Sequence, residues 1–305
     1  MVEHLVDADV PGWWAGLGLP GLFDVHVHFL PPPVLRKVRE HFDDAGPLIG
    51  RPWPVRYRGG DEERLAQLRA LGVRRFSTLP YAHRPGIATY LNEWAAAFSD
   101  AVPDSLRSAT MFPEEGAGDY VAELVSAGTE VFKVHVQVGD FDLCDPLLEA
   151  AWGSLEDAGT PVVVHANSGP VGNTHTGPGP LRMLLDRHPR LVVVIAHLGA
   201  PEYAEFLAIA EEFERVHLDT TMAFTDFFER MAPFPTDLRP RLVALRDKVL
   251  LGSDFPHLPY AYAHQLEALQ RLDLGDDWLR AVCWHNAVRL FGEPRHARPG
   301  PVSEE

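Results

Sequence analysis

Apolar and polar residues alternate strictly over residues 23–29, and this period of two predicts a β-strand with one apolar and one polar face. Further short apolar runs follow along the chain, separated by segments with helical spacing or helix-end signals. They predict strands at residues 73–79, 105–112, 130–138, 161–165, 191–197, 216–220 and 248–254. The remaining segments predict helices at residues 34–42, 62–71, 85–98, 117–127, 145–158, 180–188, from near 201, 260–272 and 277–291.

These elements form about eight strand–helix alternations without an internal linker. Such units with short, apolar strands predict a parallel sheet covered by helices, and eight of them close a barrel. We therefore expect an α/β protein with a single domain, a (β/α)8 TIM barrel over residues 1–292, followed by a mobile tail over residues 293–305. The segment 43–60 is longer than a plain connection needs, so we expect it near the barrel mouth, where it contributes to substrate selection.

Polar side chains recur at the carboxyl ends of the predicted strands, where TIM barrels hold their active sites. His26 and His28 share the polar face of the first strand, and His165, His197 and Asp254 each follow a later aliphatic run. A single histidine at such a position is usually a hydrogen-bonded core residue. Five metal-compatible side chains at one end of four strands instead indicate a metal site. Imidazole and carboxylate ligands without thiolate suit zinc, manganese or iron, and an open position on the ion would bind water.

Composition narrows the range of partners. The formal net charge of −16 disfavours nucleic acid and anionic membranes, because a phosphate backbone would be repelled on average. Two cysteines, Cys144 and Cys283, are too few for a disulfide framework. No run of 18 apolar residues and no signal-peptide pattern occurs, so a cytoplasmic location is expected. The expected partner is a small-molecule substrate, and a homodimer is the assembly considered.

Four motifs, in order and at barrel spacing, match a known family. They are Asp24-Val25-His26-Val27-His28-Phe29-Leu30-Pro31, Pro161-Val162-Val163-Val164-His165-Ala166, Ala196-His197-Leu198-Gly199 and Gly252-Ser253-Asp254-Phe255-Pro256-His257. With them the chain resembles the amidohydrolase superfamily, and within it the branch related to aminocarboxymuconate semialdehyde decarboxylase. The segment 286–291 is similar to the closing helix of that branch.

The resemblance implies a role for each matching residue. His26, His28 and His165 are expected to bind one divalent ion, zinc in the first place. Asp254 is expected to be a further ligand that takes a proton from the activated water. His197 is expected to polarise the substrate or to transfer protons.

Other residues are candidates for the substrate pocket. Lys133 and His135 share a face of the strand predicted at 130–138. Binuclear members of the superfamily place a carboxylated, metal-bridging lysine at the position of Lys133. The mononuclear branch favours an uncarboxylated lysine that orients an acidic substrate group or pairs with an inward aspartate. His135 is expected to line the pocket, and His257 to support the metal ligands.

Two arginines and a tryptophan in the early loops complete the pocket candidates. Arg51 and Arg84 are candidates for contact with an anionic substrate group, and Trp53 for an apolar wall. Such cationic groups are what a decarboxylase would aim at a substrate carboxylate.

The branch contains hydrolases, non-oxidative decarboxylases and hydratases, so the fold does not decide the reaction. We expect a hydrolase of a small amide, ester or lactone, with a decarboxylase or hydratase as the alternative. A metal-dependent phosphoesterase or nuclease also begins with His-x-His, but the net charge disfavours nucleic acid. A non-catalytic barrel would have little use for a full set of metal ligands.

Overall fold

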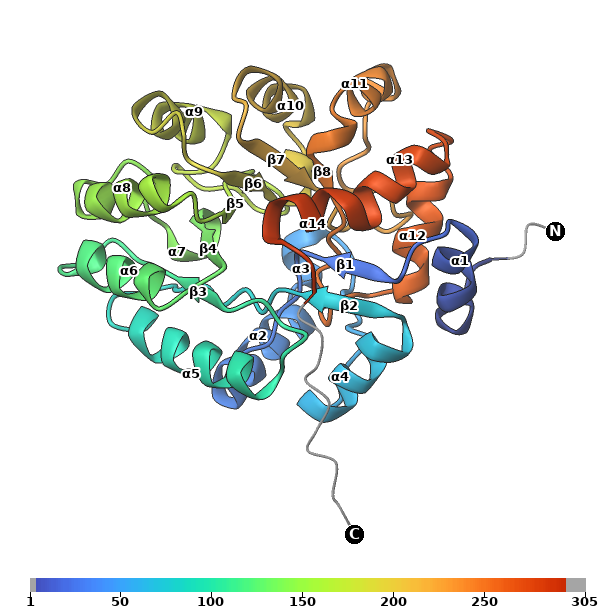
Figure 1. Cartoon of the computed structure of the whole chain (residues 1–305), viewed down its shortest axis with the longest axis horizontal. Coiled ribbons are helices and arrows are strands. Elements are labelled where there is room, and N and C mark those ends of the chain that lie inside the picture. The colour runs from blue at the N-terminus through green and yellow to red at the C-terminus, as the bar shows by residue number, and fades with distance from the viewer. Residues whose placement is uncertain (1–3, 295–305) are drawn as a thin grey trace, which may run out of the picture.

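The computed structural model describes residues 4–294, in which eight short parallel strands alternate with helices around a ring (Figure 1). The strands are β1 (Leu22–Asp24), β2 (Val73–Phe76), β3 (Ser108–Thr110), β4 (Val131–His135), β5 (Val162–His165), β6 (Val193–Ile195), β7 (Val216–Asp219) and β8 (Val249–Leu250). The α-helices are α1 (Val10–Gly16), α2 (Pro32–Asp43), α3 (Gly46–Ile49), α4 (Asp61–Ala70), α5 (Ala88–Ala101), α6 (Ala117–Ser126), α7 (Val136–Gly139), α8 (Glu149–Ala158), α9 (Pro178–Arg187), α10 (Tyr203–Glu212), α11 (Arg239–Ala244), α12 (Tyr262–Gln270), α13 (Asp276–Arg280) and α14 (Asn286–Phe291). Residues 295–305 of the predicted mobile tail lie outside the described part of the chain.

The strands close into a barrel. β3 to β8 form one parallel sheet in sequence order, and β1 pairs with β2 in a second one. Two single parallel bridges join the sheets, Val27 to Phe255 at one seam and Phe76 to Ser105 at the other. The amide of Leu106 donates to the carbonyl of Phe76 at 2.7 Å, which strengthens the second seam. The predicted single-domain (β/α)8 barrel is therefore confirmed.

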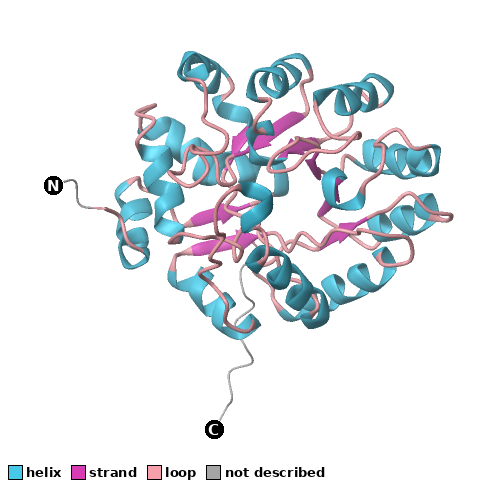
Figure 2. Ribbon diagram, turned by 180° about the vertical axis from the view of Figure 1, so that it is seen from behind, coloured by secondary structure: helices cyan, strands magenta, loops and turns pink. Residues whose placement is uncertain are grey.

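The aliphatic runs are explained by burial on both faces. Val162, Val163 and Val164 in β5 are completely buried, because one face of a barrel strand packs in the interior and the other packs under the helices. Figure 2 shows the strands inside and the helices outside. None of the helices within residues 4–294 is long and apolar enough to cross a membrane.

The regular strands are shorter than the sequence patterns predict, and the prediction that a strand continues over residues 136–138 is wrong. Residues 136–138, expected to continue the strand of Lys133, begin the short helix α7 instead. The side chain of His135 caps this helix by accepting a hydrogen bond from the amide of Val138, at 3.4 Å. The predicted loop 43–60 also contains a helical turn, α3, which lies inside the ring of outer helices (Figure 1).

Candidate metal centre

His26, His28 and Asp254 meet because the chain after β1 runs beside the chain after β8. The amide of Asp254 donates to the carbonyl of His26 at 2.9 Å, and the amide of His28 donates to the carbonyl of Phe255 at 2.7 Å. These bonds fix the relative register of the two segments. One donor atom from each of the three side chains then lies within 4.8 Å of the others.

The hydrogen bonds of the two imidazoles determine which ring nitrogen is free. Nδ1 of His26 lies 2.8 Å from Oδ2 of Asp219, and Nδ1 of His28 lies 2.9 Å from the carbonyl oxygen of Leu79. Both partners only accept hydrogen bonds, so each Nδ1 carries a proton. In the neutral rings, both Nε2 atoms therefore present lone pairs. Buried metal-binding histidines are commonly held by such a bond to the opposite nitrogen.

The free nitrogens face the carboxylate of Asp254. Oδ1 of Asp254 lies 3.0 Å from Nε2 of His28 and 3.7 Å from Nε2 of His26. Three electron-rich atoms at these separations repel one another unless a cation lies among them. Donors about 2.1 Å from a tetrahedral zinc ion are about 3.4 Å apart, so the group fits a divalent ion.

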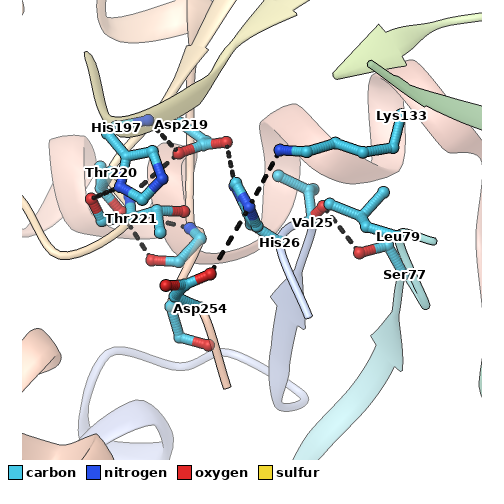
Figure 3. Close-up of polar contacts among 12 residues, drawn as sticks. Val25, His26, Ser77, Leu79, Lys133, His197, Asp219, Thr220, Thr221 and Asp254 are labelled. Carbon is cyan, nitrogen blue, oxygen red and sulfur yellow. Dashed lines mark hydrogen bonds and ion pairs between the residues drawn. The ribbon is translucent and has the colours of Figure 1, made fainter. Parts of the chain in front are cut away.

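Asp219 is the buried partner of this group that sequence reasoning missed (Figure 3). Besides binding His26, it accepts hydrogen bonds from the amides of His197 at 2.9 Å and Thr221 at 3.0 Å. Burial raises the pKa of Asp219, but its interactions with His26, among them the hydrogen bond from Nδ1, outweigh burial and hold this pKa below its usual value. The signal was present, because Asp219 also ends a strand, yet its partner His26 is 193 residues away in the sequence.

Lys133 lies on the inner side of β4, completely buried. Its Nζ is 3.2 Å from Nε2 of His26, and Figure 3 shows the amine directed at that ring. Burial lowers the pKa of Lys133 to about 8, against the opposing charges of Asp219 and Asp254. The amine therefore lies below the cavity floor and contacts the imidazole of His26.

His165 and His197 lie beside the group. Nε2 of His165 donates to the carbonyl of Gly169 at 3.0 Å, so its free nitrogen in the neutral ring is Nδ1. Nδ1 of His197 donates to the carbonyl of Thr221 at 3.1 Å, which leaves Nε2 free. Burial lowers the pKa of each ring, so both are neutral at pH 7. His165 also stacks on His135, with ring centroids 4.0 Å apart.

Backbone strain concentrates around this site. His197, Met222 and Asp254 have positive φ angles of 54°, 58° and 78°. All three line the same cavity. Non-glycine residues adopt such angles at a cost, and strained positions of this kind cluster at functional sites.

A cavity of about 420 Å³ opens above the candidate ligands. Of the predicted pocket residues, Trp53, His135 and His257 line it, and Trp53 donates from its indole to the carbonyl of His257 at 2.7 Å. Tyr81, which sequence reasoning missed, packs its ring on His28 with centroids 5.5 Å apart.

The structure does not bring Arg51 and Arg84 into this cavity. Arg51 places its guanidinium 4.0 Å from the ring centroid of Phe227 and donates to the carbonyl of that residue, outside the cavity. Arg84 is exposed on the surface. The first guanidinium is engaged by a ring and a backbone carbonyl, and the second residue lies on the exposed surface.

The structure is a TIM barrel with a histidine–carboxylate group at its mouth that could hold a metal ion. Residues 23–292 match the family model described as amidohydrolase, and the chain belongs to the amidohydrolase superfamily. The resemblance to this superfamily in the sequence motifs is thereby confirmed. No match to this chain is found among curated proteins.

Several solved structures share the fold at low sequence identity. An uncharacterised TIM-barrel protein from Bordetella bronchiseptica is 20% identical, with a TM-score of 0.71 over 88% of this chain and 98% of its own. A 5-carboxyvanillate decarboxylase from Novosphingobium aromaticivorans, complexed with manganese, is 13% identical, with a TM-score of 0.58 over 90% and 97%. A probable 2-pyrone-4,6-dicarboxylic acid hydrolase from Acinetobacter baumannii is 16% identical, with a TM-score of 0.58 over 90% and 100%.

Proposed function

We propose that this chain is a metal-dependent hydrolase of a small molecule with an ester, lactone or amide carbonyl. The observation that carries the proposal is the convergence of two unprotonated Nε2 atoms, of His26 and His28, on the carboxylate of Asp254 at the floor of a cavity. We assign these three residues, with Nδ1 of His165, as the ligands of one divalent ion, zinc or manganese. When bound, such an ion lowers the pKa of water and polarises a carbonyl.

The side chains around the ligands supply the proton transfers. The carboxylate of Asp254 lies 3.0 Å from Nε2 of His28, and in its ionised form it can accept a proton from the attacking water. Nε2 of His197 is a proton acceptor in the neutral ring, because Nδ1 already donates to Thr221. His197 is therefore proposed to take the water-derived proton from Asp254 and pass it to the leaving group, so that one proton moves from the attacking water to the leaving group.

A decarboxylase is the second candidate, supported by the structural similarity to 5-carboxyvanillate decarboxylase. The observation in its favour is a buried cationic side chain beside the candidate ligands, Lys133, whose amine lies below the cavity floor and contacts His26. However, no arginine lines the cavity in the part of the chain that the structure describes. This cavity lining supports hydrolysis more strongly than decarboxylation.

The test uses protein loaded with zinc or with manganese. Hydrolysis of neutral esters and lactones that ceases on chelation and in Asp254→Asn is the expected result. The matched control is Asp157→Asn, an exposed aspartate with 79% of its side chain accessible. Release of carbon dioxide from aromatic carboxylates, with no ester or lactone hydrolysis, would replace this proposal with the decarboxylase.

A further inference from the structure

Three exposed aliphatic side chains surround the mouth of the cavity. Within residues 4–294, eight large apolar side chains are well exposed, and three of them line this one cavity: Leu48 at 62%, Val138 at 43% and Val171 at 41%. They come from α3, from α7 and from the connection between β5 and α9. Single exposed apolar residues are ordinary, but a gathering from three separate segments at a cavity mouth indicates a binding surface. We call these three residues the apolar rim.

Below the rim, one wall of the cavity is a face of α2. Val34, Val38 and Phe42 follow one another at intervals of four residues, so they lie on the same side of the helix. Phe42 packs against Trp53 with ring centroids 5.1 Å apart. Phe42 also stacks on His257. The apolar wall therefore extends from His257 to the apolar rim.

Positive charge near the cavity is already engaged elsewhere. Lys37 is the only lysine or arginine in the cavity lining of the described residues, and its amine contacts Glu40 at 2.6 Å with 74% of its side chain exposed. Lys133, below the floor, contacts His26. A carboxylate buried along the wall would lack a partner, and an unpaired buried charge is strongly unfavourable.

We propose that the substrate is neutral and carries an apolar tail, which runs from the reacting carbonyl along the α2 face to the apolar rim. This inference rests on the proposed hydrolase function and names its substrate class. A cavity of about 420 Å³ is in the range that encloses most of a small organic molecule.

The first experiment measures kcat/KM of the metal-loaded protein for 4-nitrophenyl acetate, butyrate, pentanoate and hexanoate. Each buried methylene is expected to raise kcat/KM about fourfold. Mono-4-nitrophenyl glutarate, which carries a carboxylate in place of the terminal methyl of the pentanoate, is expected to react at least about tenfold more slowly. A flat series, or faster reaction of the glutarate, would overturn the inference while leaving the hydrolase intact.

The second experiment tests the rim. Leu48→Glu and Val171→Glu are expected to lower kcat/KM for the hexanoate at least about tenfold and to leave the acetate within about twofold. Both positions are exposed, so neither substitution places a charge in the buried core. The matched control is Val243→Glu on α11, exposed at 53% and outside the cavity lining. Equal losses for both esters, or for the control, would contradict a tail contact at the rim.

Calorimetry with ketones separates this inference from the proposed reaction, because it needs no turnover. 2-Octanone is expected to bind the metal-loaded protein at least about tenfold more tightly than 2-butanone, and Leu48→Glu to remove this difference. If no ester is hydrolysed but the ketone preference is found, the hydrolase is wrong and the apolar binding site stands. If 2-octanone binds no better than 2-butanone, the apolar tail is wrong.

Discussion

The chemistry of single residues depends here on which nitrogen of each imidazole is protonated. A carboxylate and three backbone carbonyls make that choice for His26, His28, His165 and His197, and none of these partners lies near its histidine in sequence except Gly169. The tautomers are therefore a property of the closed barrel rather than of the motifs. This preorganisation directs the free nitrogens without rearrangement.

Asp219→Asn should weaken metal binding. An amide lacks the charge that favours the proton on Nδ1 of His26, and it has one acceptor oxygen where Asp219 uses two. We expect the dissociation constant of zinc to rise about 10- to 100-fold, measured by competition with a chelator dye. Asp157→Asn is the control, and equal affinity in the two variants would contradict the role of Asp219.

His197 and His165 should differ when each is replaced by alanine. His197→Ala is expected to retain the metal and to lose about 10²- to 10⁴-fold in turnover, because it removes a proton-transfer group. His165→Ala is expected to lose metal as well as turnover. Metal content, melting temperature and rate measured on both variants decide the assignment. Retained activity in His197→Ala would show that His197 does not transfer protons. Full metal content in His165→Ala would show that His165 is not a ligand.

At the scale of elements, the strand ends carry most of what could be predicted. Aliphatic runs ending in a histidine or an aspartate marked β5, β6 and β8, because burial on both faces leaves only the strand end for a polar side chain. The sequence did not show which residues the long side chains of arginine and lysine contact. Arg51 reaches Phe227 and Lys133 reaches His26 through contacts between distant segments. The turn into α7 was missed because the alternating pattern does not show that the ring of His135 accepts a hydrogen bond from the amide of Val138.

Gly252, just after β8, should not tolerate a side chain. A Cβ atom at this position would overlap Oγ1 of Thr221 and lie 2.9 Å from Cβ of His26 and 3.2 Å from Cβ of Asp219. Gly252→Ala is expected to lower the free energy of unfolding by about 1–3 kcal/mol and to weaken metal binding, because these neighbours must shift. Gly12→Ala on α1, with no atom within 4 Å of the new Cβ, is the control for urea unfolding. Wild-type stability and metal affinity in Gly252→Ala would show that the contact relaxes freely.

At the scale of the whole molecule, stability should fall in mild acid through His217. Burial, with the charges of Lys248 and Arg289, lowers the pKa of His217 in β7 to about 4, below its value of 6.5 in the unfolded chain. Between these two pKa values the unfolded chain binds more protons, so stability declines as the pH falls from 6.5 towards 4. The loss between pH 7 and pH 5 from this residue is about 2 kcal/mol.

Urea unfolding of wild type and His217→Gln at pH 7 and pH 5 measures this contribution. The variant should lose about 2 kcal/mol less than wild type over this interval. The comparison is made without added metal, so that metal binding does not contribute to the measured stability. Parallel declines in the two proteins would show that other groups cause the acid sensitivity.

The account as a whole depends on one divalent ion at the barrel mouth, and its content in the purified protein tests this most directly. Elemental analysis after loading with zinc or manganese and removal of the excess should give about one equivalent per chain for wild type and for Asp157→Asn. His28→Ala should give far less, because it removes one of three converging donors. Loaded wild type that holds no ion, or His28→Ala that retains a full equivalent, would contradict the proposed centre.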